Sequence, residues 1–202
     1  WNWKAGGTGV ENTDGSITST VSANTDAGFS IVKYTGNSTA GATVGHGLGA
    51  APKMIITKTT NTALGNWGVY HNGVDAASPE DYMLNLNLTN ARTNSALWWN
   101  DTAPSSTVFT IGTSNDVNGS SDYIAYCFSE KEGYSKFGSY TGNGSSDGPF
   151  VYTGFRPAFV MFKKTSDIGN WWMIDNKRDT VNQMANVLLA DSSGGEFSTG
   201  TG

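Results

Sequence analysis

The chain has 202 residues with a net charge of −5; 14% of its residues are charged and 12% are aromatic. Its twelve Lys and Arg residues are scattered along the chain and form no basic stripe for a phosphate backbone, so the sequence predicts no nucleic-acid binding. No apolar run approaches the ~18 residues of a membrane-spanning helix, and a single cysteine excludes an intrachain disulfide. The abundance of Gly, Ser, Thr and Asn favours short strands joined by turns over helices.

The first 28 residues differ from the rest of the chain. Trp1 to Lys4 resembles Tyr126 to Ser129, the end of a later apolar run, and predicts the last strand of a preceding unit. Residues 4–28 hold few large apolar side chains. We therefore interpret residues 1–28 as an end strand followed by an extended linker or a strand that packs one unit on the next.

From residue 29 onwards, apolar runs alternate with clusters of Gly, Asn, Asp, Ser and Pro, a pattern that predicts strands separated by turns. The predicted strands cover residues 29–35, 43–48, 53–59, 66–71, 82–88, 96–100, 107–112 and 122–129. Eight short strands indicate an all-β fold, an antiparallel β-sandwich of the jelly-roll, lectin-like type.

The chain also contains a partial copy of itself. Three segments return 104 to 106 residues later: Gly28–Asn37 as Gly133–Asn143, Pro52–Thr59 as Pro157–Lys164, and Gly65–Trp67 as Gly169–Trp171. A period this long is a small domain, so the sequence predicts a complete repeat at 29–132 and an incomplete one at 133–202. In the second copy, residues 179–191 fit either a short helix or a strand.

Three sequence motifs resemble those of a known protein family. The runs Val44–Lys53, Tyr123–Phe128 and Gly133–Asn143 are similar to a repeated domain of uncharacterised function in structural proteins of marine tailed phages. The resemblance covers the chain from Trp1 through Ala190. It implies a virion or tail-fibre protein and carries over no catalytic residues.

Aromatic residues suggest where a ligand would bind. Trp67 and Trp171 occupy matching places in the two copies, as do Tyr34 and Tyr140, which predicts that they pack in the core. A second group combines adjacent indoles with an amide and a carboxylate: Trp98, Trp99, Asn100 and Asp101. On a strand, one indole would be exposed and could stack on a sugar, or it could pack against a neighbouring unit.

Two acidic groups allow further alternatives. Asp116, Asn118 and Asp122 lie close enough in the chain to offer oxygen ligands to calcium, although such residues are also typical of plain turns. Glu130 and Glu132 would share one face of a strand, as the carboxylates of a glycoside hydrolase do, or would form a solvated strand end.

Other reactive side chains are few. His46 and His71 have no histidine at matching places in the second copy, and with Cys127 they are too few for a zinc site. Cys127 lies within an apolar run, which predicts a buried, inert thiol.

These features lead us to expect a non-enzymatic module without a cofactor, located in a virion or outside the cell. It would serve as a spacer and adhesion unit of a phage tail fibre. Its partners would be other virion proteins or copies of itself in a homo-oligomer, with a host-surface glycan as a further ligand. Two alternatives stay open: a glycan-binding, lectin-like module of a secreted bacterial surface protein, and a polysaccharide hydrolase using Glu130 and Glu132.

Overall fold

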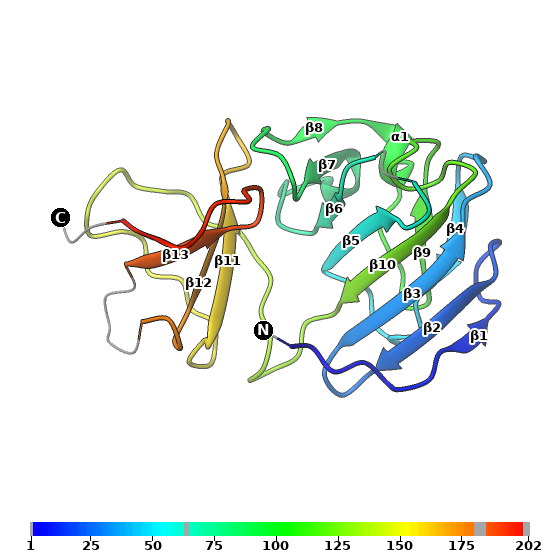
Figure 1. Cartoon of the computed structure of the whole chain (residues 1–202), viewed down its shortest axis with the longest axis horizontal. Helices are drawn as coiled ribbons and strands as arrows, with labels where there is room; N and C mark the ends of the chain where they lie inside the picture. The colour runs from blue at the N-terminus through cyan, green and yellow to red at the C-terminus, as the bar shows by residue number, and fades with distance from the viewer. Residues whose placement is uncertain (1, 63–64, 180–184, 200–202) are drawn as a thin grey trace.

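The protein consists of two β-sheet lobes that lie side by side (Figure 1). A computed structural model describes residues 2–62, 65–179 and 185–199. Every pair of neighbouring strands is antiparallel, so the prediction of an all-β fold built from antiparallel sheets is confirmed. None of the described residues belongs to a helix long and apolar enough to cross a bilayer.

The described residues of the larger lobe form ten strands and two single-turn helices. The strands are β1 (Val10–Asn12), β2 (Ser19–Asn24), β3 (Phe29–Thr35), β4 (Ala42–Gly45), β5 (Met54–Thr59), β6 (Gly68–His71), β7 (Tyr82–Asn85), β8 (Thr93–Asn94), β9 (Val108–Ile111) and β10 (Asp122–Phe128). The helices are η1 (Pro79–Asp81) and α1 (Ala96–Trp99).

Eight of these strands form one sheet in the order β1-β2-β3-β10-β5-β6-β7-β8. Strand β10 lies at its centre, paired with β3 on one side and β5 on the other. Its side chains alternate between fully buried and partly covered, with Tyr123, Ala125 and Cys127 on the buried face. This alternation follows from the period of two along a strand.

The main core lies between that face and a second layer formed by α1 and the two-stranded β4–β9 sheet. Trp99 from α1 and Phe109 from β9 are among its largest fully buried side chains. Phe109 packs edge-on against Tyr34 of β3, with 6.1 Å between ring centroids, and Trp99 packs edge-on against Tyr70 of β6 at 5.8 Å. The larger lobe is therefore held together by contacts between layers from distant parts of the chain.

The smaller lobe is a four-stranded sheet in the order β11 (Phe159–Lys163), β12 (Trp171–Asp175), β13 (Asn186–Leu189) and β14 (Phe197–Ser198). These strands repeat β5 to β8 in order and in register. Met54 of β5 pairs with His71 of β6, and Phe159 and Asp175 form the corresponding pair between β11 and β12. Likewise, Tyr82 of β7 pairs with Asn94 of β8, and Asn186 and Ser198 form the corresponding pair between β13 and β14.

The two lobes meet across an apolar junction on the face of the large sheet opposite the main core. Its buried members are Met54, Val69, Val74 and Leu84 from the larger lobe and Trp171 from the smaller one. Met161 and Ala190 of the smaller lobe pack against them. The large sheet is thus covered on one face by the β4–β9 layer and on part of the other by the second lobe.

The interpretation of residues 4–28 as a linker is wrong for much of this stretch. Strand β2 pairs with β3, and β1 pairs with β2, so both extend the main sheet. Ile17 and Val21 enter the main core. Small Ser, Thr and Ala residues hid the strand pattern of β2, because Val21 is the only large apolar side chain among its buried residues.

One other local prediction is corrected by the structure, and one alternative that the sequence left open is decided in part. The strand expected at 96–100 is instead the helix α1, which ends at Asn100 in the left-handed conformation (φ 53°). The segment 179–191 contains strand β13, while residues 180–184 lie outside the described residues.

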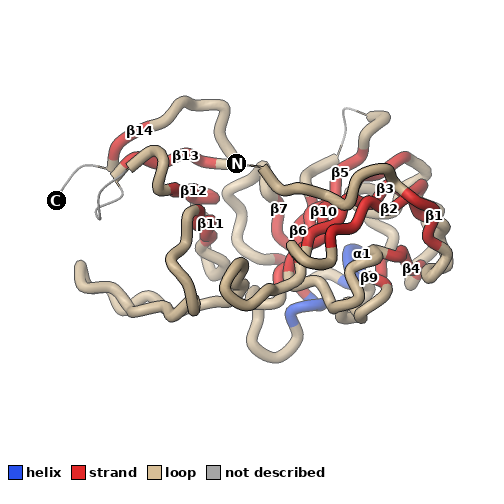
Figure 2. The backbone as a smooth tube through the Cα atoms, turned by 90° about the horizontal axis from the view of Figure 1, so that it is seen from below, coloured by secondary structure: helices blue, strands red, loops and turns tan. Residues whose placement is uncertain are grey.

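Tyr140 is not a core residue, although its sequence position matches Tyr34. The side chain of Tyr34 is 2% exposed and that of Tyr140 is 56% exposed. No strand lies between β10 and β11, and Figure 2 shows that loops make up much of the smaller lobe.

Candidate functional site

The two indoles of the predicted sugar-binding group are buried, whereas Asn100 is partly exposed and Asp101 is exposed. The side chains of Trp98 and Trp99 are 7% and 1% exposed. A Cβ placed on Gly68 would lie 2.4 Å from the Trp98 ring, so this indole fills space over the sheet. Asn100 and Asp101 both have left-handed backbone angles and form the turn that ends α1. In this structure the four residues therefore belong to the covering layer of the core and present no aromatic platform to a ligand.

The predicted calcium ligands are each engaged in separate hydrogen bonds. Asn118 is fully buried; its amide oxygen accepts from the Asn37 N–H (2.9 Å), and its amide nitrogen donates to the Thr39 and Gly112 oxygens (2.9 and 2.7 Å). Asp116 accepts from the Asn66 N–H at 2.6 Å. The arrangement fits the turn interpretation, in which polar side chains bond the local backbone.

Asp122 is the third of these predicted ligands. Its carboxylate accepts from the Thr35 hydroxyl at 2.8 Å, which links the start of β10 to the end of β3. Within residues 2–62, 65–179 and 185–199, no three His, Cys, Asp and Glu side chains gather in a position to hold a metal ion.

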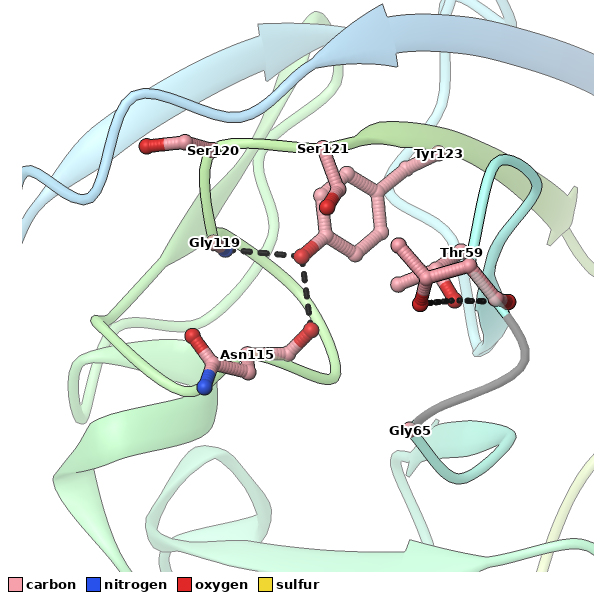
Figure 3. A pocket seen from close by; sticks show the side chains of 8 residues that line it. Thr59, Gly65, Asn115, Gly119, Ser120, Ser121 and Tyr123 are labelled. Carbon is pink, nitrogen blue, oxygen red and sulfur yellow. Dashed lines mark hydrogen bonds between the residues drawn. The ribbon is translucent and has the colours of Figure 1, made fainter.

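The same loop forms a small polar pocket at the start of β10 (Figure 3). The Tyr123 hydroxyl donates to the Asn115 backbone oxygen at 2.6 Å and accepts from the Gly119 N–H at 2.7 Å. The pocket has a volume of about 200 Å³, and its other lining residues are Thr59, Thr62, Gly65, Ser120 and Ser121. Pockets for drug-sized ligands are typically ~300–1,000 Å³, so this one suits at most a very small polar molecule.

A second crevice of about 240 Å³ lies where the lobes meet, lined by Trp67, Leu86, Asn87 and Ala190. The Asn87 side-chain oxygen accepts from the Trp67 backbone N–H at 2.9 Å, and its amide nitrogen donates to the Asn66 side chain at 3.1 Å. Trp67 is partly exposed, whereas its counterpart Trp171 is buried in the junction. The crevice therefore places a partly exposed indole beside an amide, the combination that the sequence analysis assigned to Trp98 and Asn100.

The two histidines are neutral structural residues. The Nδ1 atom of buried His46 accepts from the Leu48 N–H at 3.2 Å, and its Nε2 atom lies 3.2 Å from the Ser105 oxygen. The Nδ1 atom of His71 accepts from the Gly73 N–H at 3.0 Å. Burial lowers the pKa of His46 and brings the pKa of His71 to about 4, because charging an imidazole away from water is unfavourable.

Glu130 and Glu132 do not form a carboxylate pair on a strand, since β10 ends at Phe128. Glu130 accepts a hydrogen bond from the Lys136 ammonium at 2.6 Å, which lowers the pKa of that carboxyl. A glycosidase acid requires a raised pKa, so Glu130 is poorly suited to that role. Cys127 is fully buried, and burial raises the pKa of its thiol to about 12, which leaves almost no reactive thiolate at neutral pH.

The junction between the lobes is held by hydrogen bonds as well as by apolar packing, and no sequence pattern predicted it. The Trp171 indole nitrogen donates to the Asn85 backbone oxygen at 2.8 Å. Backbone hydrogen bonds join Gly169 to Thr89 and Arg92 to Thr165, both at 2.9 Å. The one sequence feature that bore on this junction was the match between Trp67 and Trp171. It predicted that Trp171 would be buried, but not that it would be buried against the other lobe.

The chain is thus an all-β protein in which a four-strand unit occurs twice, and the second copy of the unit packs on the lobe that contains the first. The chain belongs to the family described as domain of unknown function DUF7483, whose model matches residues 1–202. No curated protein and no solved structure matches the chain.

Proposed function

We propose that the chain is a structural and adhesion module of a phage virion, part of a tail fibre or tail-associated protein, and that it acts outside the cell. The observation that carries this proposal is the apolar junction at which the second repeat packs on the first. Contacts of this kind oppose movement of one repeat relative to the next. Rigidity is what a spacer needs in order to hold a binding surface away from a particle.

The contacts across the junction support this mechanical role. Trp171 combines apolar burial with a hydrogen bond to Asn85 of the other lobe. The Lys163 ammonium donates to the Thr89 backbone oxygen at 3.1 Å, beside the Gly169 bond to the same oxygen. A tilt of one lobe would break several of these contacts together, so the contacts favour a single arrangement of the repeats.

The virion assignment rests on the resemblance of Val44–Lys53, Tyr123–Phe128 and Gly133–Asn143 to repeats of marine tailed-phage structural proteins. Its test is electron microscopy of purified particles labelled with gold-conjugated antibody against residues 1–202. Label at the tail or its fibres, together with peptides of the chain in mass spectra of the particles, would support the proposal. Absence of both label and peptides from intact particles would overturn it.

The rigidity argument has a separate test. Small-angle X-ray scattering of the wild-type chain should fit one fixed arrangement of the lobes, whereas Trp171→Ala should broaden the distribution of distances. Trp67→Ala is the matched control, since Trp67 lies outside the buried junction cluster. Equal broadening in both variants would contradict a specific role for the Trp171 contact.

Glycan binding is a second candidate function, favoured by the crevice at Trp67 and Asn87. A partly exposed indole can stack on the apolar face of a sugar while an amide bonds its hydroxyls. Titration with host-surface polysaccharide should quench tryptophan fluorescence in the wild type and not in Trp67→Phe with Asn87→Ala. Quenching that survives both changes would place any sugar site elsewhere.

A further inference from the structure

The N-terminal segment, residues 2–9, contacts both lobes. It precedes β1 and forms neither a strand nor a helix. In Figure 1 it begins between the lobes and runs along the larger one towards β1. The Trp3 ring packs edge-on against Phe128 of the larger lobe and Phe159 of the smaller one, with 5.8 Å between ring centroids in each pair. A third ring, that of Phe29, lies 6.5 Å away. Trp3 therefore joins aromatic side chains of the two lobes.

The residues that follow Trp3 are attached to strand β2 of the larger lobe. The backbone oxygen of Lys4 accepts a hydrogen bond from the Asn24 amide nitrogen at 3.0 Å. The backbone oxygen of Gly7 accepts one from the Ser22 hydroxyl at 2.6 Å. Both donors belong to β2, so these bonds hold the segment on the larger lobe through groups that are not part of the smaller one.

Gly6 allows the segment to lie this close to β2. A Cβ atom placed on Gly6 would lie 2.0 Å from the Ala23 backbone oxygen, which is far inside van der Waals contact. A residue without a side chain is therefore needed at this position. A Cβ placed on Gly142, by contrast, would meet no heavy atom within 4 Å. Adding one methyl group to Gly6 thus provides a way to displace the segment while leaving Trp3 intact.

Trp3 and Trp171 contact opposite ends of the smaller lobe's first strand pair. Phe159 is the first residue of β11, whereas Trp171 pairs with its last residue, Lys163. At the rise of an extended strand these two ends are about 13 Å apart. The hydrogen bond from Trp171 to Asn85 lies at one end, and the Trp3 contact lies at the other. The two contacts together therefore oppose rotation of the smaller lobe about either one.

The larger lobe contains a matching aromatic contact of its own. Phe128 pairs with Met54, the first residue of β5, and Met54 corresponds to Phe159 in the repeat. The sequence similarity noted above aligns Trp3 with Phe128. Each of these two aromatic side chains therefore lies beside the first residue of the corresponding strand, β5 or β11, which indicates that the Trp3 contact is a property of the repeat.

We infer that residues 2–7 are a latch that closes the junction between the lobes at its Phe159 end. With the latch in place, the smaller lobe is held at both ends of β11. When the latch detaches, the contacts of Trp171 remain and act as a hinge. Trp3 is 42% exposed and the latch belongs to no sheet, so it can detach without opening either lobe. This inference concerns contacts within the chain and does not depend on the virion assignment.

The test measures the distance between the lobes at the latched end by pulsed electron resonance. Spin labels are attached at Asp26→Cys and Lys177→Cys, both exposed positions. Asp26 lies in the turn before β3, whose first residue contacts the latch, and Lys177 follows β12, whose last residue pairs with Phe159. Cys127 is fully buried and stays unlabelled. The otherwise unchanged chain should give one narrow distribution of distances.

Two independent changes should release the latch. Trp3→Ala removes its aromatic contact with both lobes, and Gly6→Ala pushes the segment away from β2. Each should broaden the distribution and shift its mean to longer distances. Gly142→Ala adds the same methyl group in open space, and Tyr152→Ala removes an aromatic side chain that is 77% exposed, so both controls should leave the distribution unchanged. Adding Trp171→Ala to Trp3→Ala should broaden it further than Trp3→Ala alone.

Four results would overturn the inference. The first is a broad distribution in the otherwise unchanged chain, and the second is a distribution that Trp3→Ala leaves as it was. The third is equal broadening in the two controls. The fourth comes from hydrogen exchange at Tyr123–Cys127, in the centre of the main sheet: if Trp3→Ala accelerated exchange there, Trp3 would stabilise the larger lobe as a whole and would not be a latch. None of these results would bear on whether the chain occurs in virions.

Discussion

The indole nitrogen of Trp171 donates a 2.8 Å hydrogen bond to the backbone oxygen of Asn85, which joins the second repeat to the first. The two residues are far apart in the chain, and Trp171 is nearly fully buried between the lobes. The matching Trp67 stays partly exposed at a crevice. Equivalent tryptophans therefore have different roles, one at the junction and one at its margin.

Replacing Trp171 should destabilise the junction. Trp171→Ala is expected to cost about 3–5 kcal/mol, because it removes a large buried side chain. Trp171→Phe should cost less, about 1–3 kcal/mol, since it leaves the Asn85 oxygen without its donor but keeps much of the apolar contact. Urea denaturation of each variant measures both values. If Trp67→Ala lowered the unfolding free energy as much as Trp171→Ala, the specific role of Trp171 at the junction would be contradicted.

Removing one hydroxyl should distinguish the two matched tyrosines. Tyr34→Phe deletes the buried hydrogen bond to Val117 and is expected to cost about 1–2 kcal/mol of unfolding free energy. Tyr140→Phe, at an exposed position, should change stability by less than about 0.5 kcal/mol. Paired thermal melts provide the comparison, and equal effects would mean that Tyr140 is buried in solution.

The loop around Asn118 should depend on its amide and not on calcium. Asn118→Ala leaves one N–H and two backbone oxygens without their partner and is expected to cost about 2–4 kcal/mol. Ser120→Ala, on the exposed side of the loop, is the control. Calcium or EDTA should leave the melting temperature of the wild type unchanged. A rise with calcium that Asp116→Asn abolishes would revive the metal-site interpretation.

Acidification should weaken the fold partly through His71. Its pKa is about 4 in the folded protein and about 6.5 in the unfolded chain, so the unfolded state binds the proton more readily. The contribution of neutral His71 is fully present above pH ~6.5 and is lost as pH falls from there towards 4. Denaturation of the wild type and of His71→Asn at several pH values isolates this effect. If the unfolding free energy of the two proteins depended on pH in the same way, His71 would be ruled out as a source of the acid destabilisation.

The sequence was sufficient for the all-β class and most strands of the larger lobe, because these depend on local alternation and turn residues. Strand β3 was predicted with its observed bounds at Phe29–Thr35, and β10 was predicted to within one residue. Strand β2 was missed, and the helix at Trp98 and Trp99 was taken for a strand, because local composition there is ambiguous.

Only the tertiary structure decided which residues are available for function. Tyr34 and Tyr140 lie in almost the same local sequence, yet only Tyr34 is buried, because its partners come from segments more than seventy residues further along the chain. The amide of Asn118 is likewise used by backbone groups of distant loops. Strand pairing and layer packing are non-local, so the exposure of a side chain depends on which partner segments are present as well as on its own sequence.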